Sequence, residues 1–146
     1  MIRLARLSDA DQVLDIENTC FDDPGVYKLN ASTIRYHIRL GDRMWVAYRE
    51  HDHRSAAGYL LLSHASSLGQ RRVYSVAVHQ DAQGQGIGRR LMKHAIRKTR
   101  GRLTLEVDTY NVGARKLYES LGFREIGSYP HYYGRGHHAI RMERTK

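Results

Sequence analysis

Residues 78–98 read VHQDAQGQGIGRRLMKHAIRK, and this stretch is the most informative in the chain. Gly84, Gly86 and Gly88 alternate with other residues, and a run with helical periodicity follows them. Residues 84–98 also hold five Lys or Arg side chains. Free backbone N–H groups and the positive end of a helix together favour a bound phosphate. The stretch therefore predicts a glycine loop and a basic helix that bind a phosphate-bearing ligand.

The bulk properties indicate an ordinary globular protein. The chain has 146 residues, of which 41% are hydrophobic and 27% charged, so we expect one domain over residues 1–146. It contains no apolar run long enough for a membrane helix, and its first residues lack the apolar core of a signal peptide, so we expect a cytoplasmic protein. Cys20 is the single cysteine, which excludes an internal disulfide and a zinc site built on cysteines.

The positive charge is unevenly distributed. The net charge is +9, and residues 71–102 hold nine Lys or Arg against one acid, Asp81, which gives +8. Such a segment is typical of contact with nucleic acid, an anionic small molecule or an acidic protein, or of a solvated helix face. Because the charges adjoin the glycine loop, a bound anion is the favoured interpretation.

Apolar periodicity and turn residues predict the order of the elements. We expect a mixed α/β domain with strands and helices at 2–7 (strand), 8–21 (helix), 31–41 (helix), 44–50, 56–65 and 71–79 (strands), 86–100 (helix), 103–109 (strand), 112–122 (helix), 123–129 and 138–144 (strands).

The glycine loop differs from the two best-known phosphate loops. No Gly-Lys-Ser or Gly-Lys-Thr follows it, as a Walker loop requires. A dinucleotide fingerprint starting at Gly84 needs a glycine where Arg89 stands. What remains is Gln-x-x-Gly-x-Gly over residues 83–88.

This motif resembles the pyrophosphate loop of the GCN5-related N-acetyltransferases (GNAT). Residues 105–123, LEVDTYNVGARKLYESLGF, are similar to the second conserved block of the RimI-type branch, which acetylates ribosomal-protein N-termini. The resemblance implies a GNAT fold, in which a mixed central sheet splays between two central strands and carries helices on both faces. It also implies acetyl-CoA as co-substrate and direct transfer to a primary amine, most simply a protein N-terminal α-amine.

The resemblance assigns a set of residues to acetyl-CoA. Backbone N–H groups of the loop would surround the pyrophosphate, the strand around Ala77 would pair with the pantetheine arm, and Asn111 would contact that arm or cap the following helix. The full set is Val76, Ala77, Val78, Gln83, Gly84, Gln85, Gly86, Ile87, Gly88, Arg89 and Asn111.

Two residues are candidates for catalysis. Glu106 lies on the polar side of an alternating strand; the pattern alone favours a solvated residue or a salt bridge, whereas the resemblance implies a general base that deprotonates the acceptor amine. Tyr118 lies on the helix at 112–122, where it would be a core aromatic or, by resemblance, the acid that protonates the departing thiolate.

The acceptor is less well determined. The segment DDPGVYKLN at 22–30 replaces the Pro-Trp usual in RimI proteins, so loops 22–33 and 128–138 would decide between an open peptide groove and a closed small-amine site. A small amine or a lysine side chain is the alternative acceptor, and a basic nucleic-acid-binding domain is a distant one. We expect no metal, because the nine histidines lack the helical spacing of a zinc site, and Cys20 is expected to be a buried thiol.

Overall fold

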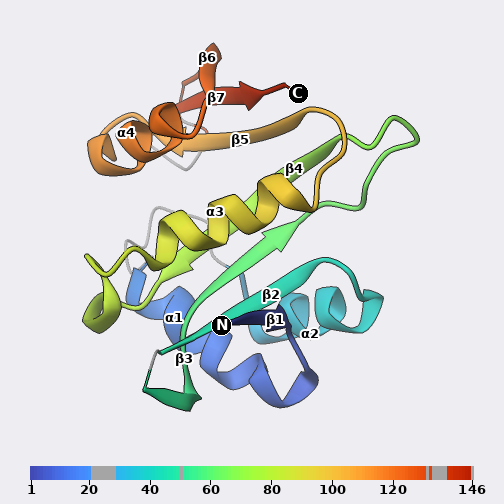
Figure 1. Ribbon diagram of the computed structural model, residues 1–146, viewed down its shortest axis with the longest axis vertical. Helices are drawn as coiled ribbons and strands as arrows, with labels where there is room; N and C mark the ends of the chain where they lie inside the picture. Colours follow the sequence, from blue (N-terminus) through green and yellow to red (C-terminus); the bar gives the residue numbers. More distant parts are fainter. Residues whose placement is uncertain (21–28, 50, 131, 133–137, 146) are drawn as a thin grey trace.

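One mixed sheet organises the molecule (Figure 1). The computed structural model describes residues 1–20, 29–49, 51–130, 132 and 138–145. Seven strands pair in the order β1-β2-β3-β4-β5-β7-β6, and all described pairs are antiparallel except β4 with β5. Loop 22–33 is therefore described only from Leu29, and loop 128–138 only at 128–130, Tyr132 and His138.

The elements follow the predicted order. They are β1 (Ile2–Leu4), a 3₁₀ turn η1 (Leu7–Asp9), α1 (Ala10–Cys20), α2 (Ala31–Leu40), β2 (Met44–Arg49), β3 (Asp52–Leu62), β4 (Arg71–Val78), a 3₁₀ turn η2 (Gln80–Ala82), α3 (Ile87–Arg97), β5 (Leu103–Asp108), α4 (Val112–Ser120), β6 (Arg124–Tyr129) and β7 (Ala139–Arg144).

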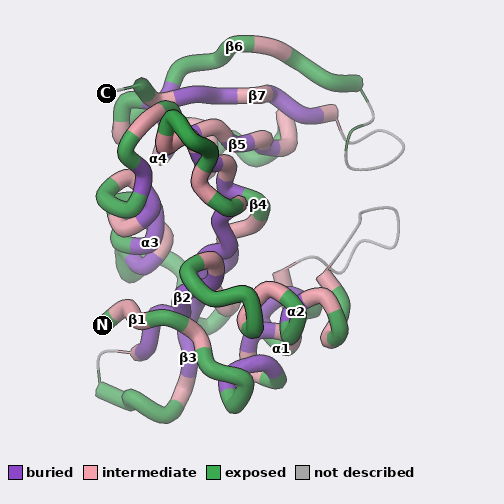
Figure 2. The backbone as a smooth tube through the Cα atoms, turned by 90° about the vertical axis from the view of Figure 1, so that its right-hand side faces the viewer, coloured by how far each residue is buried: buried purple, intermediate pink, exposed green. Residues whose placement is uncertain are grey.

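Helices cover the sheet from both sides, as Figure 2 shows in a view turned from the first. On one side α3 and α4 pack on the sheet through a core that includes Leu91, Met92, Leu105, Tyr118 and Ile140. On the other side α1 and α2 form a second core with β2, β3 and β4, which includes Val13, Ile34, Val46, Tyr59 and Ala77. Strands β2, β3 and β4 contribute residues to both cores, and β4 is the middle strand of the sheet. The described part contains no helix long and apolar enough to cross a membrane.

The central strands β4 and β5 separate after a short paired segment. They share register only at Arg71↔Leu103, Arg72↔Thr104 and Val73↔Leu105, and then diverge (Figure 1). The divergence starts beside a β-bulge, because Leu61 pairs with Ser75 but Leu62 pairs with Val73. The extra residue bends β4 away from its parallel neighbour. The expected mixed sheet that splays between two central strands is therefore confirmed.

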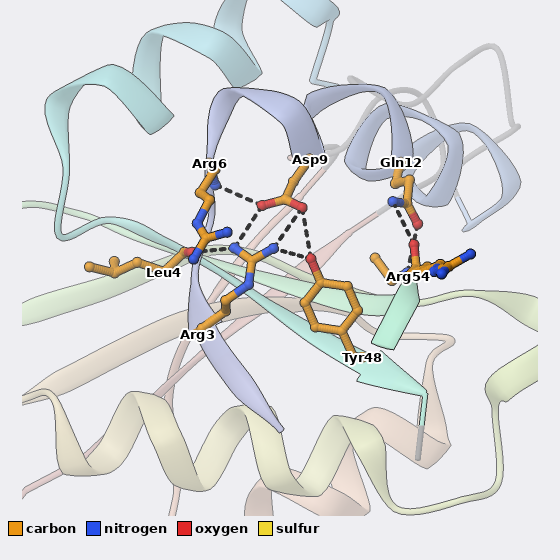
Figure 3. Close-up of polar contacts among 8 residues, drawn as sticks. Arg3, Leu4, Arg6, Asp9, Gln12, Tyr48 and Arg54 are labelled. Atoms are coloured by element: carbon orange, nitrogen blue, oxygen red, sulfur yellow. Dashed lines mark hydrogen bonds and ion pairs between the residues drawn. The ribbon is translucent and has the colours of Figure 1, made fainter. Parts of the chain in front are cut away.

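A buried ion pair fixes the amino-terminal segment to this sheet (Figure 3). Arg3 on β1 donates from Nη1 and Nη2 to Asp9 at 2.9 and 3.0 Å, and Tyr48 on β2 donates to Asp9 Oδ1 at 2.8 Å. The backbone N–H of Arg6 donates to the same carboxylate at 2.7 Å. Asp9 therefore joins η1 to two strands in a position where a lone carboxylate would be costly to bury.

The predicted boundaries differ mainly at strand ends. The strand expected over 2–7 stops at Leu4, and the helix expected from residue 8 begins as a 3₁₀ turn before α1. The strand expected at 56–65 begins earlier, at Asp52, because Asp52 pairs with Arg49 of β2 across an irregular register, and it ends earlier, at Leu62. The strand boundaries depend on pairing with a neighbouring strand, whereas the prediction rested on polarity alone.

Candidate active site

Two glycines give the predicted phosphate-binding loop its backbone conformation. Gly84 and Gly86 adopt positive φ angles of +82° and +79°, the left-handed region that favours glycine. An added Cβ at either position would meet no atom within 4 Å, so the loop surface is open. The hydrogen bonds of α3 begin with Arg90 N donating to Gly86 O, which leaves the first N–H groups of the helix without an intrahelical acceptor. This backbone fits an anion such as a pyrophosphate.

The end of β4 presents backbone groups to the gap between the diverging strands. His79 N donates to Ala57 O of β3 at 2.7 Å, so the carbonyl of the same peptide unit, Val78 O, points away from β3. By strand alternation the backbone of Val76 faces the same way, and that of Ala77 faces β3. Val78 O accepts hydrogen bonds from Gln83 Nε2 at 3.1 Å and from the half-buried Cys20 thiol at 3.0 Å.

The basic excess is less concentrated around the loop than the sequence suggested. Arg89 lies beside α4, where it donates to Ser120 Oγ at 3.1 Å. Arg71 is buried and donates to the carbonyls of Ser63, Lys98 and Asp42. Arg72 contacts Glu106 instead. The basic side chains of segment 71–102 therefore lie on both faces of the sheet. A count of charges along the sequence cannot show on which face each one lies.

Glu106 lies at the centre of four polar side chains, Arg72, Glu106, Tyr132 and Arg141, which we call the Glu106 cluster. Glu106 Oε1 lies 2.5 Å from Arg72 Nη2 and 3.3 Å from Arg141 Nη2, and accepts from the Tyr132 hydroxyl at 3.2 Å. Arg72 also donates to the Tyr132 hydroxyl. The neighbours of Glu106 on its strand, Leu105 and Val107, face the α3 and α4 core, so the cluster lies on the opposite side of the sheet.

One oxygen of this carboxylate remains free within the cluster. The Glu106 side chain is 3% exposed, and Oε2 is buried without a hydrogen-bond partner in the described part of the chain. Arg72 Nε is buried and unpartnered in the same described residues. A buried acceptor without a donor is costly, so Oε2 is suited to receive a donor from an incoming molecule.

Tyr118 lies on the other side of the sheet. Its ring packs against Phe123, with ring centroids 5.9 Å apart, and burial raises the pKa of its hydroxyl to about 12. It is thus both a core aromatic and a phenol that stays protonated.

Asn111 caps α4, because its side chain accepts a hydrogen bond from Ala114 N at 3.2 Å. This agrees with the helix-capping role that the sequence offered for it as one of two alternatives. Gly88 lies where α3 approaches α4, since a Cβ there would lie 3.8 Å from Leu117.

The structure thus brings the loop, the β4 edge and α4 to the diverging end of β4, and places Glu106 on β5, the strand from which β4 diverges. The sequence analysis missed Arg72 and Arg141. Arg141 alternates with buried Ile140 and Met142 on β7, so its side of the sheet could be predicted from the sequence. Its position opposite Glu106 could not, because it follows from strand register.

Nowhere in residues 1–20, 29–49, 51–130, 132 and 138–145 do three or more His, Cys, Asp or Glu side chains form a group that would hold a metal.

Several known proteins are similar to this chain in sequence. The chain is 28% identical, over 97% of its length and 89% of the relative's, to an N-alpha-acetyltransferase of Sulfolobus acidocaldarius. It is 41% identical over 45% of its length to the [ribosomal protein bS18]-alanine N-acetyltransferase of Escherichia coli, and the match spans 47% of that protein. A 5-NmdU N-acetyltransferase of Pseudomonas phage PaMx11 is 33% identical over 57% of this chain and 59% of its own length.

Solved structures show the same fold. The ribosomal-protein-S18-alanine N-acetyltransferase from Escherichia coli superposes with a TM-score of 0.80 at 26% identity, covering 99% of this chain and 92% of that one. Ard1 from Thermoplasma volcanium superposes with a TM-score of 0.83 at 23% identity, covering 99% and 96% of the two chains. The model of the acetyltransferase (GNAT) family matches residues 10–123, which include the glycine loop and the block through Phe123, and the chain therefore belongs to this family of acetyltransferases.

Proposed function

We propose that this acetyltransferase transfers acetyl from acetyl-CoA, the co-substrate used in its family, to the α-amine of a protein or peptide N-terminus. The observation that carries the proposal is Oε2 of Glu106, which is buried and has no hydrogen-bond partner in the described part of the chain. This atom lies on the side of the sheet where α1 and α2 pack against β2, β3 and β4. In support, one relative is named an N-alpha-acetyltransferase and another a [ribosomal protein bS18]-alanine N-acetyltransferase.

Glu106 would act as the general base. Its Oε2 would accept a proton from the acceptor amine, directly or through a water, so that the neutral amine attacks the thioester carbonyl. An N-terminal amine has a pKa of about 7.7–8.0 and is partly neutral near pH 7.5, whereas a lysine amine at about 10.4 is almost wholly protonated. A single carboxylate is therefore better matched to an N-terminal amine than to a lysine.

The other predicted residues would bind acetyl-CoA and stabilise the thiolate that leaves it. The loop from Gln83 to Gly88, with Arg89, would bind the pyrophosphate, and the open edge of β4 at Val76 and Val78 would bind the pantetheine arm. Tyr118 would donate a hydrogen bond to the thiolate as the C–S bond breaks. Since its pKa is raised to about 12, this donation is better supported than complete proton transfer to a thiolate whose conjugate acid has a pKa near 8.5.

Product analysis tests the acceptor class. The enzyme and acetyl-CoA are incubated with a peptide library, a panel of small amines and a 5-NmdU nucleoside, and the acetylated atom is located by mass spectrometry. Each peptide is paired with a copy whose N-terminus is blocked and whose lysine is free. We expect acetylation at the α-amine of unblocked peptides. Acetylation confined to blocked peptides, small amines or the nucleoside would contradict the proposal.

A further inference from the structure

The Glu106 cluster carries more positive than negative charge. Its two guanidinium groups share one carboxylate, and both contact the same oxygen of Glu106. The Arg72 and Arg141 side chains are 38% and 33% exposed, whereas Glu106 is 3% exposed. The surplus positive charge therefore faces outward, on the side of the sheet where an acceptor would approach the free oxygen of Glu106.

Neighbouring rings hold the two guanidinium groups in place. The guanidinium carbon of Arg72 lies 5.4 Å from the centre of the Tyr74 ring, and that of Arg141 lies 4.5 Å from the centre of the Tyr129 ring. Stacking on aromatic faces restricts the planes of the guanidinium groups and leaves their N–H edges available for hydrogen bonds. These planar edges match the two oxygens of a carboxylate.

We propose that Arg72 and Arg141 make the enzyme selective for acidic N-termini, in which an Asp or Glu follows the residue that carries the reactive amine. This inference rests on the proposed N-terminal function. The acceptor carboxylate takes N–H bonds from both guanidinium groups, and Glu106 is correspondingly released from its two ion pairs. The same contact thus binds the acceptor and leaves Glu106 free to take the proton from the amine.

The position of the charges favours a peptide over a nucleic acid. Carboxylate binding by these two arginines is already present in the structure, since Glu106 occupies them. A nucleic acid would need a longer basic track. The basic residues of α3, Arg89, Arg90, Lys93 and Arg97, lie on a helix that packs on the other side of the sheet through its buried Ile87, Leu91 and Met92.

Matched peptides test this selectivity. Three peptides begin Ala-Asp, Ala-Asn and Ala-Lys and are otherwise identical, and kcat/KM is measured for each. For the wild type we expect kcat/KM for Ala-Asp to exceed that for Ala-Asn by at least about tenfold. The ratio should shrink when salt is raised, because the guanidinium groups are partly exposed.

Variants locate the selectivity. In Arg141→Gln and in Arg72→Gln the Asp-to-Asn ratio should fall towards one, and Arg141→Lys should recover part of it because it keeps the charge without the planar fork. Arg124→Gln is the matched control: Arg124 pairs with Glu143 on the neighbouring strands at 2.8 Å, is 75% exposed and should leave the ratio unchanged. The ratio is taken within each variant, so a general loss of activity does not affect it.

The outcomes separate this inference from the function on which it rests. Equal kcat/KM for Ala-Asp and Ala-Asn in the wild type, or a ratio that survives both Arg→Gln changes, would overturn the selectivity while leaving N-terminal acetylation intact. Failure to acetylate any of the three peptides, with acetylation of an oligonucleotide that carries a primary amine, would overturn both.

Discussion

Glu106 accepts all of its described hydrogen bonds through Oε1, and this asymmetry gives the carboxylate a free face for chemistry. We expect Glu106→Gln to lower kcat/KM by about 10²–10⁴-fold at pH 7, the usual contribution of a general base. The amide keeps the shape of the side chain but cannot take a proton. The loss should diminish as the pH rises through about 8, because the N-terminal amine then becomes neutral without assistance.

Profiles of kcat/KM against pH for the wild type and the variant would check this. Glu125→Gln provides the control, since Glu125 is a half-exposed carboxylate on β6 that lies 4.0 Å from Arg115. A Glu106→Gln enzyme with a wild-type profile would assign this carboxylate a purely structural role.

Substitution of Tyr118 should cause a loss of turnover that high pH does not reverse. Because burial raises the pKa of Tyr118 to about 12, its hydroxyl remains a donor throughout the range in which the enzyme would be assayed. Tyr118→Phe should slow turnover about 10–100-fold without recovery at high pH, since the missing group serves the leaving thiolate and not the amine. Turnover with an acetyl thioester whose thiol has a lower pKa would measure this, because a better leaving group should suffer less from the substitution.

Among the elements, the junction of β4, the glycine loop and α3 is the proposed anion site. Gly86→Asp should weaken acetyl-CoA binding at least about tenfold, because a carboxylate would stand beside the pyrophosphate at a helix N-terminus. Asn and Asp both tolerate the left-handed backbone of this position, so Gly86→Asn separates the effect of charge from that of the added side chain. Isothermal titration calorimetry with acetyl-CoA provides the measurement.

Arg97→Ala is the second reference for this experiment. Arg97 is exposed in the last turn of α3, far along the helix from the glycines, and its loss should change the affinity little. If Arg97→Ala and Gly86→Asp weakened binding equally, the anion would be held by the general charge of the helix and not by the loop.

Local patterns predicted the elements better than they predicted the contacts between them. Glycines at 84 and 86 are compatible with a tight loop, because glycine adopts positive φ angles that few other residues tolerate. The alternation of Leu103, Leu105 and Val107 placed Glu106 on the polar side of its strand. The pairing of Arg72 and Arg141 with Glu106 was not predictable in this way. It depends on strand register and on a bulge in β4, which sequence-distant strands determine together.

At the scale of the whole molecule, stability should depend on Asp9. Burial alone raises the pKa of Asp9, but the hydrogen bonds from Arg3, Arg6 N and the Tyr48 hydroxyl outweigh it, and the pKa lies below its usual value. A group whose folded-state pKa is depressed stabilises the fold above its unfolded pKa, and this contribution is lost as the pH falls through the folded-state pKa. The loss should therefore begin below about pH 4.

Asp9→Asn should lower the free energy of unfolding by about 1–3 kcal/mol at pH 7, since it weakens a buried charged network. The difference from the wild type should narrow at pH 3, which lies below the pKa of about 3.9 that an aspartate has in the unfolded chain. Urea unfolding at the two pH values measures both quantities. Asp11→Asn, an exposed change at the start of α1, should have little effect at either pH. An Asp9→Asn deficit that is the same at both pH values would argue against the ionised network as its source.

The short register between β4 and β5 has a consequence for cooperativity. Since only three residue pairs join these strands, the sheet consists of two hydrogen-bonded units, β1–β4 and β5–β7–β6, connected by that segment and by the core beneath α3 and α4. Amides at the diverging ends, such as those of Val76 and Val78, lack a strand partner on that side and should exchange with solvent faster than their neighbours. A ligand lying between the strands would supply those partners, so that loading with acetyl-CoA would turn two loosely coupled units into one that opens as a whole.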